Sequence, residues 1–427
     1  MSNKRIVIAL EFGENNIKLI IGERNEDKLF VYQSFIEPTN GLVNGKIVDE
    51  DSILNSMNKI IRETNRKLGI TINNVVFALP SDELKILQMQ ESSKTSNEYT
   101  VTDLDIERVR ERCRRKNPGN GLSIVEVIPT EYFVAEPPRY DELTKYGEPP
   151  LGVKSDIIKL TCSVLTLPSE TLTSYRSLLS KVGINIKSYY LKDIASFETY
   201  KGKLNKENVL QINIGSSSTS CSIFFRKRLC NTFKIAIGSD DITKDIANNL
   251  ALSYQDAETL KIKFGNALAS SCDDSIVYNK KKKDGNPLIT DLMISRIIEN
   301  KLDLIFTKIK EQADAFVSYG DYQISIIGRG ADFKNIELKT SAYFNVLAKQ
   351  YIPEVLGIRN GSLTSLYGLL ELSKDDSMEI DAYSTRENDF SKSKDDNLNV
   401  DIKLDEIKYE KKSSTKYFGA FSDEDFK

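Results

Sequence analysis

Residues 208–225 read NVLQINIGSSSTSCSIFF, and this segment contains the clearest local pattern of the chain. An apolar stretch runs up to Gly215, five hydroxyl-bearing residues follow it, and a second alternating stretch leads away. A glycine lets backbone amides approach a ligand closely, and serine and threonine hydroxyls can donate to phosphate oxygens. The segment therefore predicts a β-hairpin that holds phosphate groups.

The composition predicts a globular protein of several domains. The chain has 427 residues, 40% of them hydrophobic, which suits about two to four domains. No window approaches the ~18 apolar residues of a membrane-spanning helix, and the first apolar run is too short for a secretion signal. The five cysteines are scattered without a CxxC pair, so neither a disulfide framework nor a zinc site is expected. These features favour the cytoplasm.

The chain contains no histidine. Nucleophile pairs that depend on imidazole, and imidazole metal ligands, are therefore excluded. Any chemistry must use carboxylates, lysines or hydroxyls. The net charge of −3 gives no general attraction to nucleic acid, and the basic cluster at 108–116 is interpreted as a solvated helical face. No nucleic-acid partner is expected.

A second segment repeats the plan of the first hairpin. Residues 5–23 read RIVIALEFGENNIKLIIGE, and in this alignment Glu11 corresponds to Asn213 and Gly13 to Gly215. Two such hairpins, one at the head of each half of the chain, suggest a duplicated α/β fold with a ligand cleft between the halves. Two unrelated glycine hairpins are the alternative, because such turns are common.

A third glycine element favours the duplicated fold. Residues 322–333, YQISIIGRGADF, predict a buried strand that runs into Gly328 and Gly330 and then into a helix. Glycines at these positions allow backbone amides to approach a phosphate or a ribose. Hairpin, hairpin and strand–turn–helix, in this order, are the arrangement of the superfamily of actin, Hsp70 and the sugar kinases.

The region after the second hairpin resembles the bacterial division protein family FtsA. Residues 233–267, FKIAIGSDDITKDIANNLALSYQDAETLKIKFGNA, carry the glycine turn and the two helical motifs of that family. Shorter matches are GLVNGKIVD at 41–49, IPTEYFV at 128–134, VGINI at 182–186 and SLTSLYGLLEL at 362–372. The resemblance spans about residues 4–372. An inserted block at 85–164 has the position of subdomain 1C, which FtsA shares with the pilus-assembly protein PilM.

The resemblance implies a duplicated actin-like (ribonuclease H-like) α/β fold with an inserted 1C subdomain and a flexible C-terminal tail. The expected parts are 1A at 1–84, 165–205 and 355–373, 1C at 85–164, 2A at 206–243 and 318–354, 2B at 244–317, a disordered linker at 374–410 and a membrane-targeting segment at 411–427.

The resemblance also implies a nucleotide site that binds ATP. Its expected residues are Glu11, Gly13, Asn15, Asn213, Gly215, Ser216, Ser217, Ser218, Thr219, Gly238, Glu258, Lys261, Gly328 and Gly330. Glu258 and Lys261 match positions that border the adenosine, although a surface ion pair is the alternative for them. Arg329 replaces the usual glycine between Gly328 and Gly330, and it would either clamp a phosphate or block the pocket.

The metal-binding part of this site has fewer acidic residues than the family has there. Glu11 keeps a negative charge and is expected to hold Mg²⁺ weakly through water, but Asn213 and Ser220 are uncharged where the family has acids. Hydroxyl groups can still bind phosphate, so binding is expected without efficient hydrolysis, and no catalytic residue is assigned. An active ATPase in which Glu11 alone suffices for the metal is the competing hypothesis.

The last residues of the chain suggest a membrane contact. Tyr417, Phe418 and Phe421 can share one helical face, with Lys416 beside them, as in the terminal amphipathic helix of FtsA-like proteins. A disordered tail is the alternative, because the acids at 423–425 oppose anionic lipid and Gly419 weakens a helix. Such an anchor would be weak, and several copies in a filament would be needed to hold it.

The implied function is a cell-division scaffold. The resemblance implies polymerisation with contacts through 1C, binding of the FtsZ C-terminal tail to 2B, and attachment to the inner face of the cytoplasmic membrane at the division site. A PilM-like pilus adaptor is a further alternative, and it has no need of the linker and the aromatic end.

Overall fold

Two five-stranded sheets in this chain have the same strand order. The computed structural model describes residues 4–25, 28–96, 100–136, 142–279 and 288–373, so the predicted linker and membrane-targeting segment lie outside the described residues. The first sheet has the order β11–β6–β1–β2–β3 and the second the order β14–β13–β12–β17–β18. In each, three consecutive strands pair antiparallel and two later strands lie parallel to the first.

The strands of the first sheet are β1 (Lys4–Phe12), β2 (Asn16–Asn25), β3 (Lys28–Pro38), β6 (Asn74–Leu79) and β11 (Asn185–Leu191). Those of the second are β12 (Val209–Ile214), β13 (Thr219–Phe225), β14 (Arg228–Ile235), β17 (Gln323–Ile327) and β18 (Ala348–Gln350). The inner parallel strands β6 and β17 are buried along almost their whole length, because helices cover both faces of each sheet. The predicted duplicated α/β fold is confirmed.

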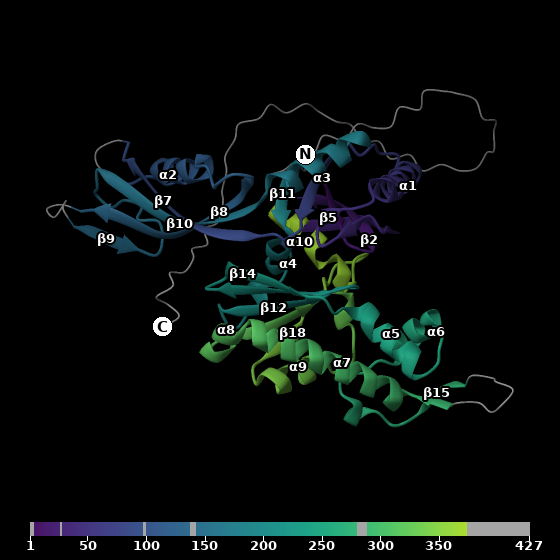
Figure 1. Cartoon of the computed structure of the whole chain (residues 1–427). Coiled ribbons are helices and arrows are strands. Elements are labelled where there is room, and N and C mark those ends of the chain that lie inside the picture. Colours follow the sequence, from purple (N-terminus) through teal and green to yellow (C-terminus); the bar gives the residue numbers. More distant parts are fainter. Residues whose placement is uncertain (1–3, 26–27, 97–99, 137–141, 280–287, 374–427) are drawn as a thin grey trace, which may run out of the picture.

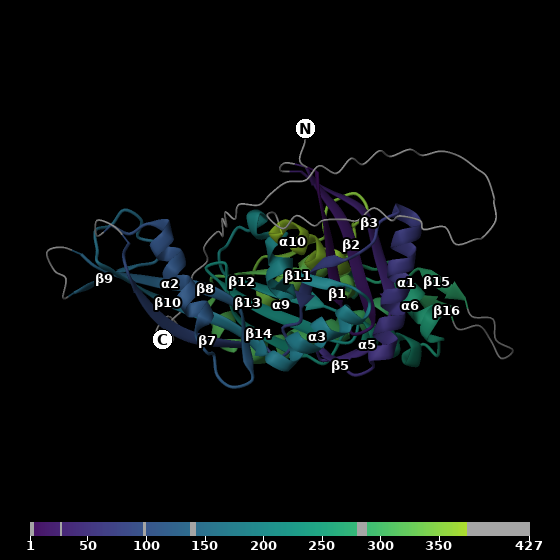
Figure 2. The ribbon, with the colours of Figure 1, turned by 90° about the horizontal axis from the view of Figure 1, so that it is seen from above.

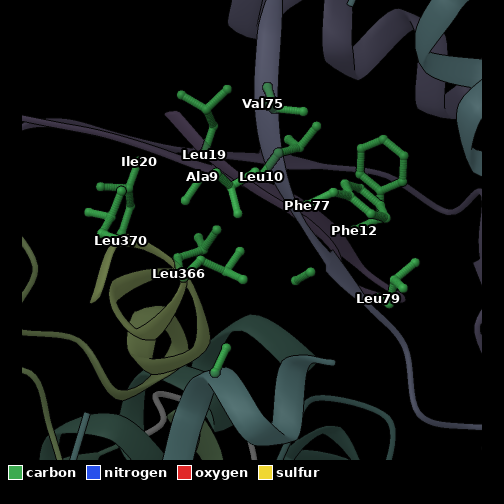
Figure 3. Close-up of a cluster of buried hydrophobic side chains, with 14 of the residues drawn as sticks. Ala9, Leu10, Phe12, Leu19, Ile20, Val75, Phe77, Leu79, Leu366 and Leu370 are labelled. Atoms are coloured by element: carbon green, nitrogen blue, oxygen red, sulfur yellow. The ribbon is translucent and has the colours of Figure 1, made fainter. Parts of the chain in front are cut away.

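Four helices sandwich the first sheet. They are α1 (Glu50–Leu68), α3 (Ser169–Lys181), α4 (Lys192–Glu198) and α10 (Thr364–Leu372). Successive side chains of a strand point to opposite faces, so the Phe12 ring meets Tyr175 of α3, whereas Glu11 contacts Ser365 of α10. Figure 3 shows Leu366 and Leu370 of α10 directed toward the strands that carry Ala9 and Ile20.

Helices α10 and α4 approach each other closely on that face. A Cβ atom at Gly368 of α10 would lie 1.6 Å from the carbonyl oxygen of Ala195, so only glycine fits there. This contact packs the last described helix against α4, the segment that leads into the second half.

The inserted block forms a sheet and core of its own. Its antiparallel strands are β7 (Lys85–Lys94), β8 (Leu122–Ala135), β9 (Leu143–Tyr146) and β10 (Ile157–Pro168), in the order β7–β10–β8–β9, and α2 (Asp103–Arg115) packs on them. Val164 of β10 belongs to this core, whereas Leu165 and Leu167 belong to the core of the first half. Figures 1 and 2 show the block at one end of the molecule, away from α5 and α6.

The arginines of α2 are engaged with neighbouring groups. Arg114 pairs with Glu107 at 2.7 Å, Arg115 pairs with Glu111 at 2.9 Å, and Arg112 donates to the backbone oxygen of Ser92 at 2.6 Å. Arg112 and Arg115 are exposed, as expected for a solvated basic face, but Arg110 is only 2% exposed, so the expectation is wrong for that residue.

The second half is completed by helices and a small hairpin. These elements are α5 (Ser239–Asn249), α6 (Tyr254–Phe264), α7 (Asp291–Gln312), α8 (Asp314–Tyr319), α9 (Ile336–Phe344), β15 (Ile276–Asn279) and β16 (Leu288–Thr290). Short elements elsewhere are β4 (Leu42–Val43), β5 (Lys46–Ile47) and 3-10 turns at Lys201–Lys203, Ala269–Ser271, Arg329–Ala331 and Gly361–Leu363. None of the helices in the described ranges is long and apolar enough to cross a membrane.

Candidate nucleotide site between the two halves

The β1–β2 and β12–β13 hairpins have the same backbone geometry. Glu11 lies opposite Lys18 in the first, and Asn213 lies opposite Ser220 in the second. Each turn is closed in the same way: the Gly13 amide donates to Asn16 O at 2.8 Å, and the Gly215 amide donates to Ser218 O at 2.9 Å. The predicted alignment of Glu11 with Asn213 and of Gly13 with Gly215 is therefore the structural one.

The two hairpins face each other across one polar cleft. A cavity of about 160 Å³ is lined by both turns, by the segments after β6 and β17, and by the start of α4. Asn15 Nδ2 donates to Asp240 Oδ2 across the cleft at 2.9 Å, and Ser217 Oγ donates to the Glu14 carboxylate. This cavity is smaller than the ~300–1000 Å³ of common ligand pockets.

The turn after β17 forms the third wall, and its first glycine is required by packing. Gly328 has φ of +91°, and a Cβ atom there would lie 2.4 Å from Asn213 Oδ1. Gly330 approaches the Ile214 side chain and Gly238 approaches Ser216 O in a similar way. These three glycines therefore hold the second hairpin against its neighbours, and of the three only Gly328 lines the cavity.

Glu11 lies in a buried ion pair. Lys18 Nζ is 2.9 Å from Glu11 Oε1, and the Ser365 hydroxyl donates to the other carboxylate oxygen. Burial alone would raise the pKa of Glu11, but Lys18 and Ser365 outweigh it, so the pKa lies below its usual value. Glu11 is therefore a carboxylate whose charge is already balanced by the protein.

A second charged group spans the cleft. Lys234 of β14 contacts Asp82 Oδ1 at 2.7 Å and Glu14 Oε1 at 2.6 Å, so it joins the second half to the first. Lys192, at the start of α4, lies 3.6 Å from Asp82 Oδ2. Burial alone would raise the pKa of Asp82, but Lys192 and Lys234 lower it below its usual value.

The pKa of Lys192 is raised, whereas that of its partner Asp82 is lowered. Burial alone would lower the pKa of Lys192, but the carboxylates of Asp82, Asp193 and Glu11 raise it above its usual value. Lys192 therefore remains a cation at the wall of the cavity over the physiological pH range.

The residues present do not fit a divalent cation. Mg²⁺ prefers six oxygen ligands in near-octahedral geometry. In this cleft the oxygens of Glu11, Glu14 and Asp82 are bound by lysine ammonium groups, and the facing positions are the neutral Asn213 and Ser220. Among the described residues no group of three or more acidic or cysteine side chains is placed to hold a metal ion.

The structure brings most of the expected phosphate-binding residues together. The cavity is lined by Glu11, Gly13, Asn15, Asn213, Gly215, Ser216, Ser217, Ser218 and Gly328 of the predicted set. Thr219 is buried behind the turn and donates to Ile237 O at 2.8 Å. Gly238, Gly330, Glu258 and Lys261 do not line this cavity. The predicted membrane residues Lys416, Tyr417, Phe418 and Phe421 lie outside the described ranges.

Glu258 and Lys261 form a pair beneath the N-terminus of α5. Lys261 Nζ lies 2.6 Å from Glu258 Oε2 and donates to Ser239 Oγ at 2.7 Å and to Thr243 Oγ1 at 2.6 Å. Its side chain is only 3% exposed, so this is not a surface ion pair. Arg329 NH2 lies 3.9 Å from Glu258 Oε1, which places Arg329 between this pair and the cavity that it lines.

Several cavity residues were not found from the sequence. They are Glu14, Lys18, Asp82, Lys192, Ser196, Lys234, Asn360 and Ser365. Asp82 follows the carboxyl end of a buried parallel strand, where ligand sites of α/β sheets collect, so the sequence did contain a signal for it. Lys18 could also have been predicted, because the register of the hairpin places it opposite Glu11. Lys192, Lys234 and Ser365 reach the cleft through tertiary packing, and no local pattern marks them.

Two halves with one strand order, facing each other across a polar cleft, define an actin-like protein. Solved structures agree: a PilM–PilN type IV pilus biogenesis complex gives a TM-score of 0.54 at 15% identity and covers 86% of this chain and 98% of that chain. MreB5 of Spiroplasma citri bound to ADP gives 0.51 at 12% identity, covering 87% and 96%. At these identities the similarity concerns the fold alone.

The family follows from sequence comparisons. A family model described as "Cell division protein FtsA" matches residues 210–368. The cell division protein FtsA of Enterococcus faecalis is 25% identical over 382 residues, which cover 87% of this chain and 84% of that protein. These matches support an FtsA-family protein, although a divergent one, in agreement with the motifs of its sequence.

Proposed function

We propose that this chain is an actin-like scaffold of cell division that binds ATP between its halves and turns it over slowly or not at all. One observation carries the nucleotide part: Gly13 and Gly215, from equivalent hairpins of the two halves, line the same cavity. The Ser216 and Ser218 hydroxyls and backbone amides are available there to donate to phosphate oxygens, whereas the Ser217 hydroxyl already donates to Glu14. MreB5, which shares the fold, has been solved with bound ADP.

Slow turnover follows from the protonation chemistry of the cleft. A general base is most effective when its pKa lies near the working pH. The pKa values of Glu11 and Asp82 are both lowered by lysines, so these carboxylates are weak bases, and the chain has no histidine. The side chains present are therefore better suited to binding a phosphate chain than to activating water.

Phosphate release by the purified full chain at saturating ATP tests this proposal. We expect release near the background rate, with no change in the variant Glu11→Ala. Release well above background that is lost in Glu11→Ala would instead establish an active ATPase.

We further propose that subdomain 2B binds the C-terminal tail of FtsZ and that protomers associate through 1C. Residues 244–317 carry several exposed large apolar side chains, namely Tyr254, Ile262, Ile276, Leu288, Met293 and Leu304. Exposed apolar groups of this kind are typical of protein-binding surfaces. The 1C block has its own hydrophobic core and stands at one end of the molecule, which suits a contact between successive protomers (Figure 2).

The C-terminal segment is proposed as the membrane contact. Lys416, Tyr417, Phe418 and Phe421 combine a positive charge with aromatic groups, a composition that favours the interface of a bilayer. The protein would then lie on the inner face of the cytoplasmic membrane at the division site. Because one such segment binds weakly, filament formation would supply the avidity.

Co-sedimentation of FtsZ with anionic liposomes tests the scaffold. We expect FtsZ to sediment only when the full chain is present, and not when residues 411–427 are deleted. The variant Ile262→Asp is the matched control, because it should keep liposome binding and lose FtsZ. Unchanged liposome binding after the deletion would favour a PilM-like adaptor or a role away from the membrane.

A further inference from the structure

Three lysines from different parts of the fold line the cleft. Lys18 lies on β2, Lys192 at the start of α4 and Lys234 on β14. Their side chains are 12%, 24% and 23% exposed, so each is largely enclosed by protein. Together with Arg329 they set four cationic groups against the carboxylates of Glu11, Glu14 and Asp82 in the same cavity wall.

Two of these lysines are committed to carboxylates at hydrogen-bond distance. Lys18 contacts Glu11 at 2.9 Å, and Lys234 contacts both Glu14 and Asp82. A divalent cation that used these carboxylates would have to displace an ammonium group from each of them. Such displacement is costly, because an enclosed lysine that loses its carboxylate partner is left as an unpaired charge.

Lys192 differs from the other two. Its nearest carboxylate oxygen, Asp82 Oδ2, is 3.6 Å away, which is longer than an N–H···O hydrogen bond. An ammonium group has three donors, so Lys192 can bind an anion in the cavity without breaking a short ion pair. It also lines the same cavity as Gly13 and Gly215, the two turns that would hold the phosphates.

We propose that Lys192 serves as a built-in cation of this site, so that the cleft binds the phosphate chain of a nucleoside di- or triphosphate without a divalent metal ion. This inference rests on the nucleotide site proposed above and adds the form of the ligand, which is the metal-free nucleotide. The ammonium group neutralises phosphate charge at the place where Glu11, Asp82 and the uncharged Asn213 offer no set of oxygens for Mg²⁺.

Equilibrium binding of a fluorescent ATP analogue to the full chain, in excess Mg²⁺ and in excess EDTA, tests the proposal. We expect the two dissociation constants of the wild type to differ by less than about threefold. In Lys192→Met the affinity in EDTA should fall by about tenfold or more, and Mg²⁺ should restore part of it because Mg²⁺ carried by the nucleotide itself would neutralise phosphate charge in place of the missing ammonium group. Lys192→Arg keeps the charge and should keep binding in EDTA.

The controls separate this role from a structural one. Lys59→Met removes an exposed lysine on α1 and should leave both affinities unchanged. If Lys192 only supported the fold, Lys192→Met would lower both affinities equally and leave their ratio as in the wild type, which would contradict the proposal. Wild-type binding that requires Mg²⁺ would overturn the built-in cation and leave the nucleotide site standing. No binding in either condition would overturn the nucleotide site itself.

Discussion

The two hairpins of the cleft share one backbone and carry different chemistry. Both have a glycine turn closed by the same hydrogen bond, and both pair residues in the same register. The first presents an ion pair, Glu11 with Lys18, at the position where the second presents the neutral pair Asn213 and Ser220. The two hairpins thus share their backbone geometry but differ in the charge of the side chains that they present.

This difference shows which features of the site are set by backbone packing and which by side chains. The glycines around the second hairpin are required because neighbouring atoms leave no room for a Cβ atom. The charged groups of the first hairpin, Glu11 and Lys18, stabilise each other through their ion pair. We therefore expect that both can be replaced together by a neutral pair. The predictions below test this distinction, beginning with the backbone.

The largest effect is expected at Gly328, which presses against the second hairpin. In Gly328→Ala the new Cβ atom would meet Asn213 Oδ1 at 2.4 Å, and the backbone would hold a positive φ that alanine disfavours. We expect the free energy of unfolding to fall by about 3 kcal/mol, which a urea denaturation curve would measure.

Gly320→Ala is the matched control for this substitution. Gly320 also has a positive φ, of +77°, but its Cβ position is almost open, with the nearest atom at 4.0 Å. Its cost should therefore be the backbone term alone, about 1 kcal/mol. Equal losses in the two variants would mean that close packing against the second hairpin is not the reason for Gly328.

An intermediate effect is expected from breaking the ion pair of the first hairpin. Lys18→Met leaves the Glu11 carboxylate buried with Ser365 as its remaining hydrogen-bond partner. Removing the charged hydrogen-bond partner of a carboxylate that keeps its bond from Ser365 should lower the free energy of unfolding by about 2 kcal/mol.

The double variant Glu11→Asn/Lys18→Ser gives the first hairpin the chemistry of the second. If the two hairpins are equivalent in geometry, the double variant should unfold within about 1 kcal/mol of the wild type. A double variant less stable than Lys18→Met would show that the first hairpin depends on its own charges and is not interchangeable with the second.

The smallest effect is expected in the dependence of stability on acidic pH. The pKa of Glu11 is lowered from its usual 4.5, chiefly by Lys18 against the opposing effect of burial, so the stability it contributes is present above pH 4.5. This contribution is lost as the pH falls through the lower pKa of the folded state. Urea midpoints measured from about pH 6 down to about pH 3 should therefore decline more steeply for the wild type than for Glu11→Asn/Lys18→Ser.

Titrating groups away from the Glu11–Lys18 pair cancel in that comparison. Burial raises the pKa of Glu126, which therefore has the opposite effect and favours the folded state at low pH, but Glu126 is present in both proteins. Parallel declines would contradict the assignment of the Glu11–Lys18 pair as a source of acid sensitivity.

The sequence was sufficient to predict the backbone turns that surround the site. Alternation of apolar residues and the glycine turns placed Gly13, Gly215 and Gly328 correctly around one cavity, because hairpin geometry depends on neighbours in the sequence. The inserted block at 85–164 was also recognisable, since it interrupts the duplicated pattern with strands that form a separate core.

The charges of the cleft were largely not predictable. Lys192 and Lys234 meet Asp82 only because α4, β14 and the turn after β6 converge in space, and no spacing in the chain encodes that convergence. The pair Glu258 and Lys261 illustrates the converse. Its i,i+3 spacing predicted a shared helix face correctly, but which face is buried depends on the packing of α5.

The central claim is that the two equivalent hairpins hold one nucleotide between them, and a crystal structure of the full chain with ATP tests it most directly. The account predicts density for the phosphate chain between the Gly13 and Gly215 turns, within hydrogen-bond distance of the serines at 216–218 and of Lys192. A nucleotide bound elsewhere, or a cleft that stays closed by the contacts of Glu14 with Ser217 and Lys234 at saturating ATP, would contradict it.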